Sequence, residues 1–163
     1  MGERKFATGV LFVCMGNICR SPTALAVFRQ MLDEHGLADR VLADSAGTHD
    51  YHAGEPPDPR AIKAAAHRGY DLSGLRARVI RRQDFETFDY VLAMDRANLA
   101  RLRELAPRRY VGKPRLFLEF SSLVPGGELP DPYCAGAEAF EKVLDLVEDA
   151  ARGLLGEVAR KLA

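Results

Sequence analysis

Residues 14–22 hold the side chains best suited to chemistry, in the order C-M-G-N-I-C-R-S-P. The thiol of Cys14 can act as a nucleophile, and the planar guanidinium of Arg20 can bind two phosphate oxygens at once. When such a segment joins a strand to a helix, its backbone N–H groups turn inward and meet the positive end of the helix dipole. The amides, the helix end and the arginine all favour a thiolate. The segment therefore predicts an anion site in which a thiolate lies beneath a bound phosphate, in line with phosphorus.

The same segment has other interpretations. A single cysteine at a strand end is more often a small buried hydrophobic residue, and a glycine-rich turn can equally bind a nucleotide. However, the segment has neither the Lys-Ser/Thr ending of a Walker loop nor the pattern G-x-G-x-x-G. Gly16 allows backbone geometry that a side chain would resist, and Asn17 tolerates left-handed angles. The combination of Cys, Gly, Asn, Arg, Ser and Pro in this order favours the phosphate site.

A strand and a helix must hold this segment in place. Residues 10–13, Val-Leu-Phe-Val, form a short apolar run typical of a strand buried on both faces. Apolar residues at positions 24, 27, 28, 31 and 32 follow the helical period. Ser21 as N-cap and Pro22 at the first helical position predict where this helix begins, and Gly36 predicts where it ends.

Strand-like and helix-like segments alternate along the rest of the chain. Further strands are predicted at residues 41–43, 90–94 and 116–118, and further helices at residues 60–68, 97–105 and 140–162. Gly153 and Gly156 interrupt the apolar stripe of the last helix, so we expect a bend or a break there.

This alternation predicts an α/β fold of three layers, with a parallel sheet between two layers of helices. Ligands of such sheets bind beyond the carboxyl ends of the strands, so the loops after Val13, Ala43 and Met94 should share one rim. Residues 47–59 and 124–136 are too rich in Gly and Pro for long regular elements, and we expect loops there.

Composition limits the class of protein. The length of 163 residues corresponds to one domain, over residues 1–163, and 47% hydrophobic with 28% charged residues is typical of a folded chain. Lys plus Arg and Asp plus Glu number 23 each, and this balance argues against nucleic acid or an anionic membrane as partner. No apolar run approaches the roughly 20 residues that span a bilayer, and the N-terminal apolar stretch is too short for a signal peptide. We expect a soluble, cytoplasmic protein.

Cysteine and histidine usage points the same way. Three cysteines, Cys14, Cys19 and Cys134, are a poor framework for structural disulfides. The four histidines do not pair with them at the spacing of a zinc site, so we expect no metal and no other cofactor.

Residues 14–22 resemble the phosphate-binding loop of the low-molecular-weight protein tyrosine phosphatases. The resemblance covers nearly the whole chain and extends to four further motifs: D-S-A-G-T at 44–48, G-E-P-P-D-P-R at 54–60, T-F-D-Y-V-L-A-M-D at 87–95 with Asn98, and D-P-Y at 131–133. It implies the phosphotyrosine phosphatase I-like fold, with a four-stranded parallel sheet in the order 2-1-3-4.

The resemblance also implies the catalytic residues. Cys14 would be the nucleophile that forms a cysteinyl-phosphate, Arg20 would stabilise the charge on the phosphoryl oxygens, and Asp131 would protonate the leaving phenolate and later activate water. From the residues alone, an aspartate before Pro132 is more typical of a turn. The phosphate would be bound by Met15, Gly16, Asn17, Ile18, Cys19 and Arg20.

Further residues match supporting positions of the family. Ser21 would hydrogen-bond the thiolate, and a network holding the loop would comprise Asn17, Ser45 and His67. The walls and floor of the substrate pocket would be Tyr51, Tyr133, Met15 and Ile18.

The cysteines other than Cys14 have an expected role in oxidation. By resemblance, Cys19 would form a reversible disulfide with Cys14 under peroxide. Cys134 could compete as the second thiol because it is close to Asp131 in the sequence.

Three rival functions stay open. Thioredoxin-coupled arsenate reductases use a similar loop, but they need two further cysteines in a mobile segment, and residues 51–111 contain none. Phosphoarginine phosphatases of the same superfamily usually carry Thr where this chain has Ile18. A non-enzymatic phosphate-binding module would not need Cys14, Arg20, Ser21 and Asp131 together. The expected partner is a phosphotyrosine-containing protein, for example a tyrosine kinase, and the expected assembly is a monomer or a weakly self-associating chain.

Overall fold

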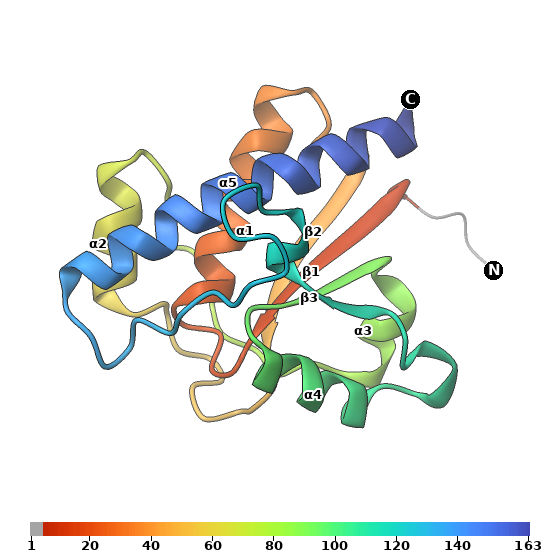
Figure 1. Ribbon diagram of the computed structural model, residues 1–163, viewed down its shortest axis with the longest axis horizontal. Helices are drawn as coiled ribbons and strands as arrows, with labels where there is room; N and C mark the ends of the chain where they lie inside the picture. Colours follow the sequence, from red (N-terminus) through yellow and green to blue (C-terminus); the bar gives the residue numbers. More distant parts are fainter. Residues whose placement is uncertain (1–4) are drawn as a thin grey trace.

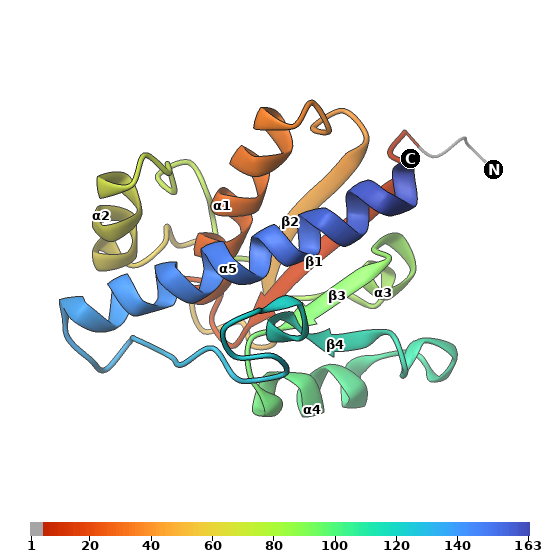
Figure 2. The same ribbon diagram turned by 45° about the horizontal axis from the view of Figure 1, so that its top comes forward.

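Four parallel strands form the centre of the molecule, between two layers of helices (Figures 1 and 2). The computed structural model describes residues 5–163. The strands are β1 (Thr8–Cys14), β2 (Val41–Gly47), β3 (Tyr90–Ala93) and β4 (Pro114–Leu116), in the order β2-β1-β3-β4. In the central pairings, Phe12 of β1 lies beside Ser45 of β2 and Leu92 of β3. The predicted parallel sheet and its strand order are confirmed.

Side chains of β1 alternate between two hydrophobic cores, as the two-residue period of a strand requires. Val10 and Phe12 pack beneath α1 (Arg20–Glu34) and α5 (Ala137–Leu162), where the ring of Phe12 meets Phe28 and Phe117 edge-on at centroid distances of 5.6 and 5.2 Å. Leu11 and Val13 pack on the other face, with α3 (Arg82–Thr87) and α4 (Arg96–Leu105). Every residue of β1 is buried, which is why residues 10–13 are apolar without interruption.

Helix α2 (Pro59–His67) lies at the edge of the α1/α5 layer and packs against α5 (Figure 2). Its buried face consists of small residues, Ala61, Ala64 and Ala65, so the helix approaches α5 closely. Asp58 caps its first turn by accepting a hydrogen bond from the backbone of Arg60, and Pro59 follows at the first helical position.

Two predicted boundaries are wrong. Ser21 does not cap α1, which begins at Arg20 with Cys19 as N-cap residue and no side-chain cap; the hydroxyl of Ser21 has partners in the site instead. The fourth strand is at Pro114–Leu116, and the apolar residues after it form a 3-10 helix, Phe117–Phe120, whose Phe117 and Leu118 are fully buried. Apolar content there reflects burial in the core and not strand structure.

Two short helices were not predicted. These are α3 and a 3-10 helix at Arg108–Tyr110. Neither is long enough to show a helical period in the sequence. The side chain of Asp84 accepts a hydrogen bond from the backbone N–H of Arg81 and so fixes the start of α3.

Helix α5 runs without a break through Gly153 and Gly156, contrary to the expected bend or break. Gly153 is needed for close packing, because a Cβ there would lie 2.0 Å from the backbone oxygen of Phe120. At Gly156 the nearest atom to such a Cβ is the flexible end of Arg160, at 3.5 Å. The two glycines therefore stand in different environments on one helix.

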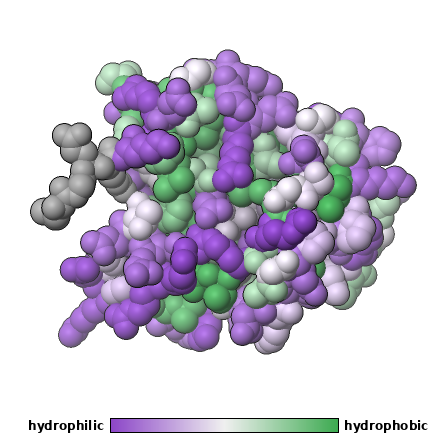
Figure 3. Space-filling view, turned by 180° about the vertical axis from the view of Figure 1, so that it is seen from behind, coloured by the Kyte–Doolittle hydropathy of each residue, from purple (hydrophilic) through white to green (hydrophobic). Residues whose placement is uncertain are grey.

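The carboxyl ends of β1, β2 and β3 deliver Cys14, Gly47 and Asp95 to one rim, as predicted. The side of the molecule opposite to the view of Figure 1 is mostly hydrophilic, with hydrophobic side chains in small separate areas (Figure 3). Within residues 5–163, no helix has the length and apolar character that crossing a membrane requires.

Candidate active site

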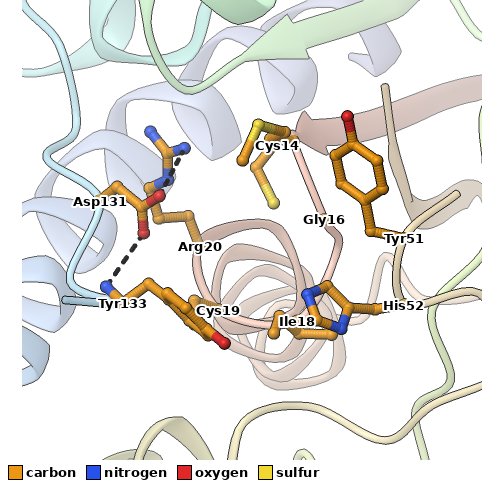
Figure 4. A pocket seen from close by; sticks show the side chains of 10 residues that line it. Cys14, Gly16, Ile18, Cys19, Arg20, Tyr51, His52, Asp131 and Tyr133 are labelled. Carbon is orange, nitrogen blue, oxygen red and sulfur yellow. Dashed lines mark hydrogen bonds and ion pairs between the residues drawn. The ribbon is translucent and has the colours of Figure 1, made fainter. Parts of the chain in front are cut away.

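Cys14 lies at the carboxyl end of the central strand, at the bottom of a pocket (Figure 4). Its side chain is buried, and its Sγ lies 3.0 Å from Oγ of Ser21, the second residue of α1. The same Oγ accepts a hydrogen bond from Nδ2 of Asn17 at 2.7 Å. Because the hydroxyl accepts from Asn17, its own proton is free to point to the sulfur, an arrangement that stabilises negative charge on Sγ.

Asn17 fixes the shape of the loop after β1. It has a φ of 59°, in the left-handed region that Asn tolerates better than most residues. Its side chain is buried and makes three hydrogen bonds: Nδ2 donates to Ser21 and to Oγ of Ser45 (3.0 Å), while Oδ1 accepts from the backbone N–H of Arg78 (3.0 Å). The strained backbone is thus held by contacts from three separate segments.

Loop carbonyls point outward into the protein. The backbone oxygens of Cys14, Met15 and Ile18 accept hydrogen bonds from the amides of Thr48, His49 and Asp58 at 2.9, 3.1 and 2.8 Å, in that order. The N–H groups of residues 15–19 donate to no acceptor within the described chain. They are therefore available to an anion, as are the amides of other strand–loop–helix anion sites.

Gly47, at the end of β2, allows this loop to close. A Cβ at this position would lie 2.7 Å from the backbone oxygen of Met15 and 3.0 Å from that of His49. Any side chain would push the loop away from β2, so the glycine is required by close approach of two backbones.

Arg20 is held rigidly at the edge of the pocket. Its Nη1 donates to Oδ2 of Asp95 at 2.7 Å and to the backbone oxygen of Leu129 at 3.0 Å, and its Nη2 lies 3.7 Å from Oδ2 of Asp131. Burial opposes the charge of the guanidinium, but Cys14 and Asp95 outweigh it and raise the pKa of Arg20 above its ordinary value. Arg20 is therefore a fixed positive charge facing the sulfur.

Asp95 and Leu129 were not singled out from the sequence. Asp95 also caps α4, since its Oδ1 accepts a hydrogen bond from the backbone N–H of Asn98 at 2.7 Å. A carboxylate directly after a strand, with a helix beginning next to it, was a signal that could have been used. The carbonyl of Leu129 carried no signal in the sequence.

Asp131 lies across the pocket from Cys14, on the loop before α5 (Figure 4). Its side chain is 44% exposed, so water can reach it. Its Oδ1 accepts a hydrogen bond from the backbone N–H of Tyr133 at 3.1 Å, which leaves Oδ2 toward Arg20.

Aromatic side chains flank the mouth of the pocket. Tyr51 is 67% exposed and stacks on His49 at a centroid distance of 5.2 Å, and Tyr133 is 47% exposed. His52 lies between them; its ring is tilted against Tyr133 at 6.4 Å, and its Nδ1 is 2.5 Å from Oε2 of Glu55. His52 was missed by the sequence analysis. The residues around the pocket are Cys14, Met15, Gly16, Ile18, Cys19, Arg20, Tyr51, His52, Asp131 and Tyr133.

The structure does not bring His67 into the network of Asn17 and Ser45, and the expectation is corrected here. His67 is exposed at the C-terminal end of α2. The backbone N–H of Arg78 completes the network instead. Arg78 is itself held by ion pairs with Asp44 and Asp84.

All three cysteines are free thiols. Cys19 is buried beside the pocket, and its pKa is raised to about 12, first by burial and then by the negative charges of Asp58 and Cys14. Cys134 is exposed. Residues 5–163 contain no group of three or more potential metal ligands close enough to hold an ion.

A buried cysteine in a loop with unpartnered amides, beside a fixed arginine and a carboxylate at the rim of a parallel sheet, is the arrangement typical of cysteine-dependent phosphatases. Comparison with known proteins identifies the family within that class. The profile of the family described as low molecular weight phosphotyrosine protein phosphatase matches residues 9–163. A low molecular weight protein-tyrosine-phosphatase of Streptomyces coelicolor is 46% identical over 156 residues, 94% of each chain, and the human low molecular weight phosphotyrosine protein phosphatase is 40% identical over 136 residues, 82% of this chain and 85% of the human one.

Solved structures agree. The crystal structure of a protein tyrosine phosphatase from Entamoeba histolytica superposes with a TM-score of 0.90 at 37% identity and covers 96% of this chain and 99% of that one. The structure of YfkJ from Bacillus subtilis gives 0.89 at 34% identity, with 98% and 99% covered. The chain belongs to the low molecular weight phosphotyrosine protein phosphatase family. It is a protein-tyrosine phosphatase, a phosphoric monoester hydrolase.

Proposed function

We propose that this phosphatase acts on phosphotyrosine in proteins through a cysteinyl-phosphate on Cys14, with Arg20 and Asp131 as the other catalytic residues. In the first step Sγ of Cys14 attacks phosphorus, the bond from phosphorus to the tyrosyl oxygen breaks, and Asp131 gives its proton to that oxygen. In the second step Asp131 takes a proton from water, the water oxygen attacks phosphorus, and inorganic phosphate leaves as Sγ regains its electron pair. Atoms and charges balance without a cofactor.

One observation carries this proposal: Cys14, Arg20 and Asp131 surround one pocket although they come from a strand end, a helix start and a loop. The bond of Ser21 to Sγ supports the second step, because a stabilised thiolate is the better leaving group. The bonds of Arg20 to Asp95 and Leu129 support its role, because donors that are already oriented stabilise developing charge without reorganisation.

The depth of the pocket supports an aryl phosphate as substrate. Cys14 is only 3% exposed, and Tyr51 and Tyr133 flank the entrance, so a phosphoryl group on a long flat side chain reaches the sulfur and a short one does not. Ile18 contributes an apolar wall, which suits a phenyl ring better than the guanidinium of phosphoarginine. Because the preference rests on this one side chain, phosphoarginine is the second candidate substrate, and the test includes it.

The experiment compares hydrolysis of p-nitrophenyl phosphate and of phosphotyrosine, phosphoserine and phosphoarginine peptides, near pH 6 and with EDTA. We expect turnover of the two aryl phosphates, abolished in Cys14→Ser and retained in the matched variant Cys134→Ser. A preference for phosphoarginine would overturn the argument from Ile18. Failure to hydrolyse any of these phosphates would overturn the proposed mechanism, and reduction of arsenate coupled to thioredoxin would then be assayed.

A further inference from the structure

Arg60, the second residue of α2, reaches across to the loop that carries Asp131. Its Nη2 donates to the backbone oxygen of Tyr133 at 2.7 Å, and its Nη1 donates to the backbone oxygen of Ala135 at 3.2 Å. These two carbonyls belong to a turn that is closed by a hydrogen bond from the N–H of Ala135 to the oxygen of Pro132. One guanidinium thus hydrogen-bonds two backbone carbonyls of residues 133–135, directly after Asp131.

On its other side Arg60 is tied to the phosphate loop through Asp58. Its Nη2 and Nε donate to the two carboxylate oxygens of Asp58, at 2.8 and 3.1 Å. The backbone N–H of Asp58 donates to the oxygen of Ile18, inside the phosphate loop, at 2.8 Å. Through residues 58–60, a continuous path of hydrogen bonds therefore links the loop after β1 to the loop that carries Asp131.

Aromatic contacts place Arg60 more firmly. The centre of its guanidinium is 5.7 Å from the ring centroid of Tyr133 and 4.8 Å from that of Phe140, at the start of α5. Phe140 is buried and Tyr133 is half exposed, so the guanidinium lies between a ring fixed in the core and a ring at the pocket mouth.

Residues 131–135 have few other polar contacts with the rest of the described chain. The two hydrogen bonds from Arg60 are joined only by the ion pair of Arg20 and Asp131, at 3.7 Å, and four of these five residues are exposed. A general acid must lie within hydrogen-bond reach of the oxygen that it protonates, and a displacement of about 1 Å can cost about 100-fold in rate.

We infer that Arg60 is a positioning residue for Asp131: it sets how well that carboxyl protonates the leaving group, although it does not touch the substrate. This inference rests on the proposed role of Asp131. Arg60 contacts neither Cys14 nor Arg20, and it reaches the phosphate loop only through Asp58, whose backbone N–H and not its side chain donates to Ile18.

The test measures kcat/KM for a series of aryl phosphates whose leaving phenols differ in pKa. Log kcat/KM is plotted against the pKa of the leaving phenol. The slope of this plot is shallow when the enzyme protonates the leaving oxygen, and it becomes steeper when protonation is impaired. We expect Arg60→Gln to lose about tenfold or more with phenyl phosphate, a poor leaving group, and only about threefold or less with p-nitrophenyl phosphate, which needs little help. Asp131→Asn should steepen the same plot further. The losses in Arg60→Lys should lie between those of wild type and Arg60→Gln, since one ammonium cannot hydrogen-bond both carbonyls and Asp58 as the guanidinium does.

Arg68→Gln is the matched control. Arg68, at the other end of α2, binds Glu141, Asp145 and Glu148 of α5 far from the pocket mouth, so its loss should lower stability without changing the slope of the plot. An Arg60→Gln enzyme that slows equally with every substrate would overturn the inference, and so would an unchanged slope in both Arg60 variants. A slope unaltered by Asp131→Asn would instead overturn the proposed general acid itself, so the two failures are distinguishable.

Discussion

At the scale of single residues, the polar side chains of Asn17, Arg20 and Ser21 around Cys14 already have fixed partners. Ser21 accepts from Asn17 and so presents its proton to the sulfur, and Arg20 is oriented by Asp95 before any substrate arrives. A site oriented in advance spends little of its binding energy on reorganisation. Burial and the negative charges around this loop also raise the pKa of Cys19.

Cys19 is protonated at neutral pH, because burial, Asp58 and Cys14 raise its pKa to about 12. After peroxide converts Cys14 to a sulfenic acid, the Cys19 thiolate can attack that sulfur, form a disulfide and expel hydroxide. We predict that this second step accelerates by up to about tenfold per pH unit between pH 7 and 10, because the thiolate fraction rises at that rate below the pKa. Trapping of the sulfenic acid with dimedone, followed by mass spectrometry, measures it.

The control is Cys19→Ser, in which Cys14 should be oxidised further to sulfinic and sulfonic acid. Cys134→Ser separates the exposed thiol from the buried one. Sulfonic acid at Cys14 in the wild-type protein, with no Cys14–Cys19 bond at any pH, would contradict the redox role of Cys19.

Sequence alone located the residues that lie close together in the chain, and it located few of their distant partners. Residues 14–22 could be interpreted because a strand–loop–helix junction is a local structure. Asn17 and its partner Arg78 are 61 positions apart, and Arg20 and its partner Leu129 are 109 apart. Such partners depend on how elements pack, and a backbone N–H or carbonyl looks the same at every position.

At the scale of elements, periodicity predicted the main helices and strands. It did not predict how closely neighbouring elements pack against one another. The glycines of α5 were interpreted through helix propensity alone, which counts their cost in an isolated helix. In the fold, Gly153 lies against the backbone of Phe120, and a smooth helix through it is the arrangement that packs. The prediction that Ser21 caps α1 is wrong for the same reason, whereas the predicted contact of its hydroxyl with the sulfur of Cys14 is present.

These two glycines give a paired prediction for stability. Gly153→Ala should destabilise the protein by about 1–3 kcal/mol despite the better propensity of Ala, because its Cβ would overlap the oxygen of Phe120. Gly156→Ala should be neutral or stabilising by up to about 1 kcal/mol, because the flexible Arg160 side chain can move. Urea unfolding followed by circular dichroism measures both. A stabilised Gly153→Ala protein would show that the contact with Phe120 is not close.

At the scale of the whole molecule, the buried ionisable groups define a pH range for stability. On the acid side, burial opposes the charge of Asp149, but hydrogen bonds from Ser121 and Ser122 outweigh it and lower its pKa. A carboxyl whose pKa is lowered by folding contributes stability that is lost only as pH falls below its ordinary range. Above neutral pH, the stability depends on groups whose pKa is raised by folding.

Cys19 and Tyr70 both have a pKa of about 12 in the folded protein, against ordinary values of 9.0 and 10.0. Burial is the first cause for each, and Tyr70 also donates a hydrogen bond to Glu148 at 2.6 Å. Between pH 9 and 12 the unfolded chain loses these protons while the folded chain keeps them, so the folded state binds more protons and the free energy of unfolding falls as pH rises. For Cys19 the full loss is about 4 kcal/mol at most.

We therefore predict a flat free energy of unfolding from about pH 6 to 8 and a steady decline above about pH 9, measured by urea unfolding in the presence of a reductant. Cys19→Ser changes one buried titrating group and should flatten the decline, whatever constant offset the substitution adds. Cys134→Ser, at an exposed position, should leave the wild-type slope. If Cys19→Ser kept the full slope, the thiol would be titrating at its ordinary pKa, and the slow oxidative step predicted for Cys19 at neutral pH would lose its physical basis as well.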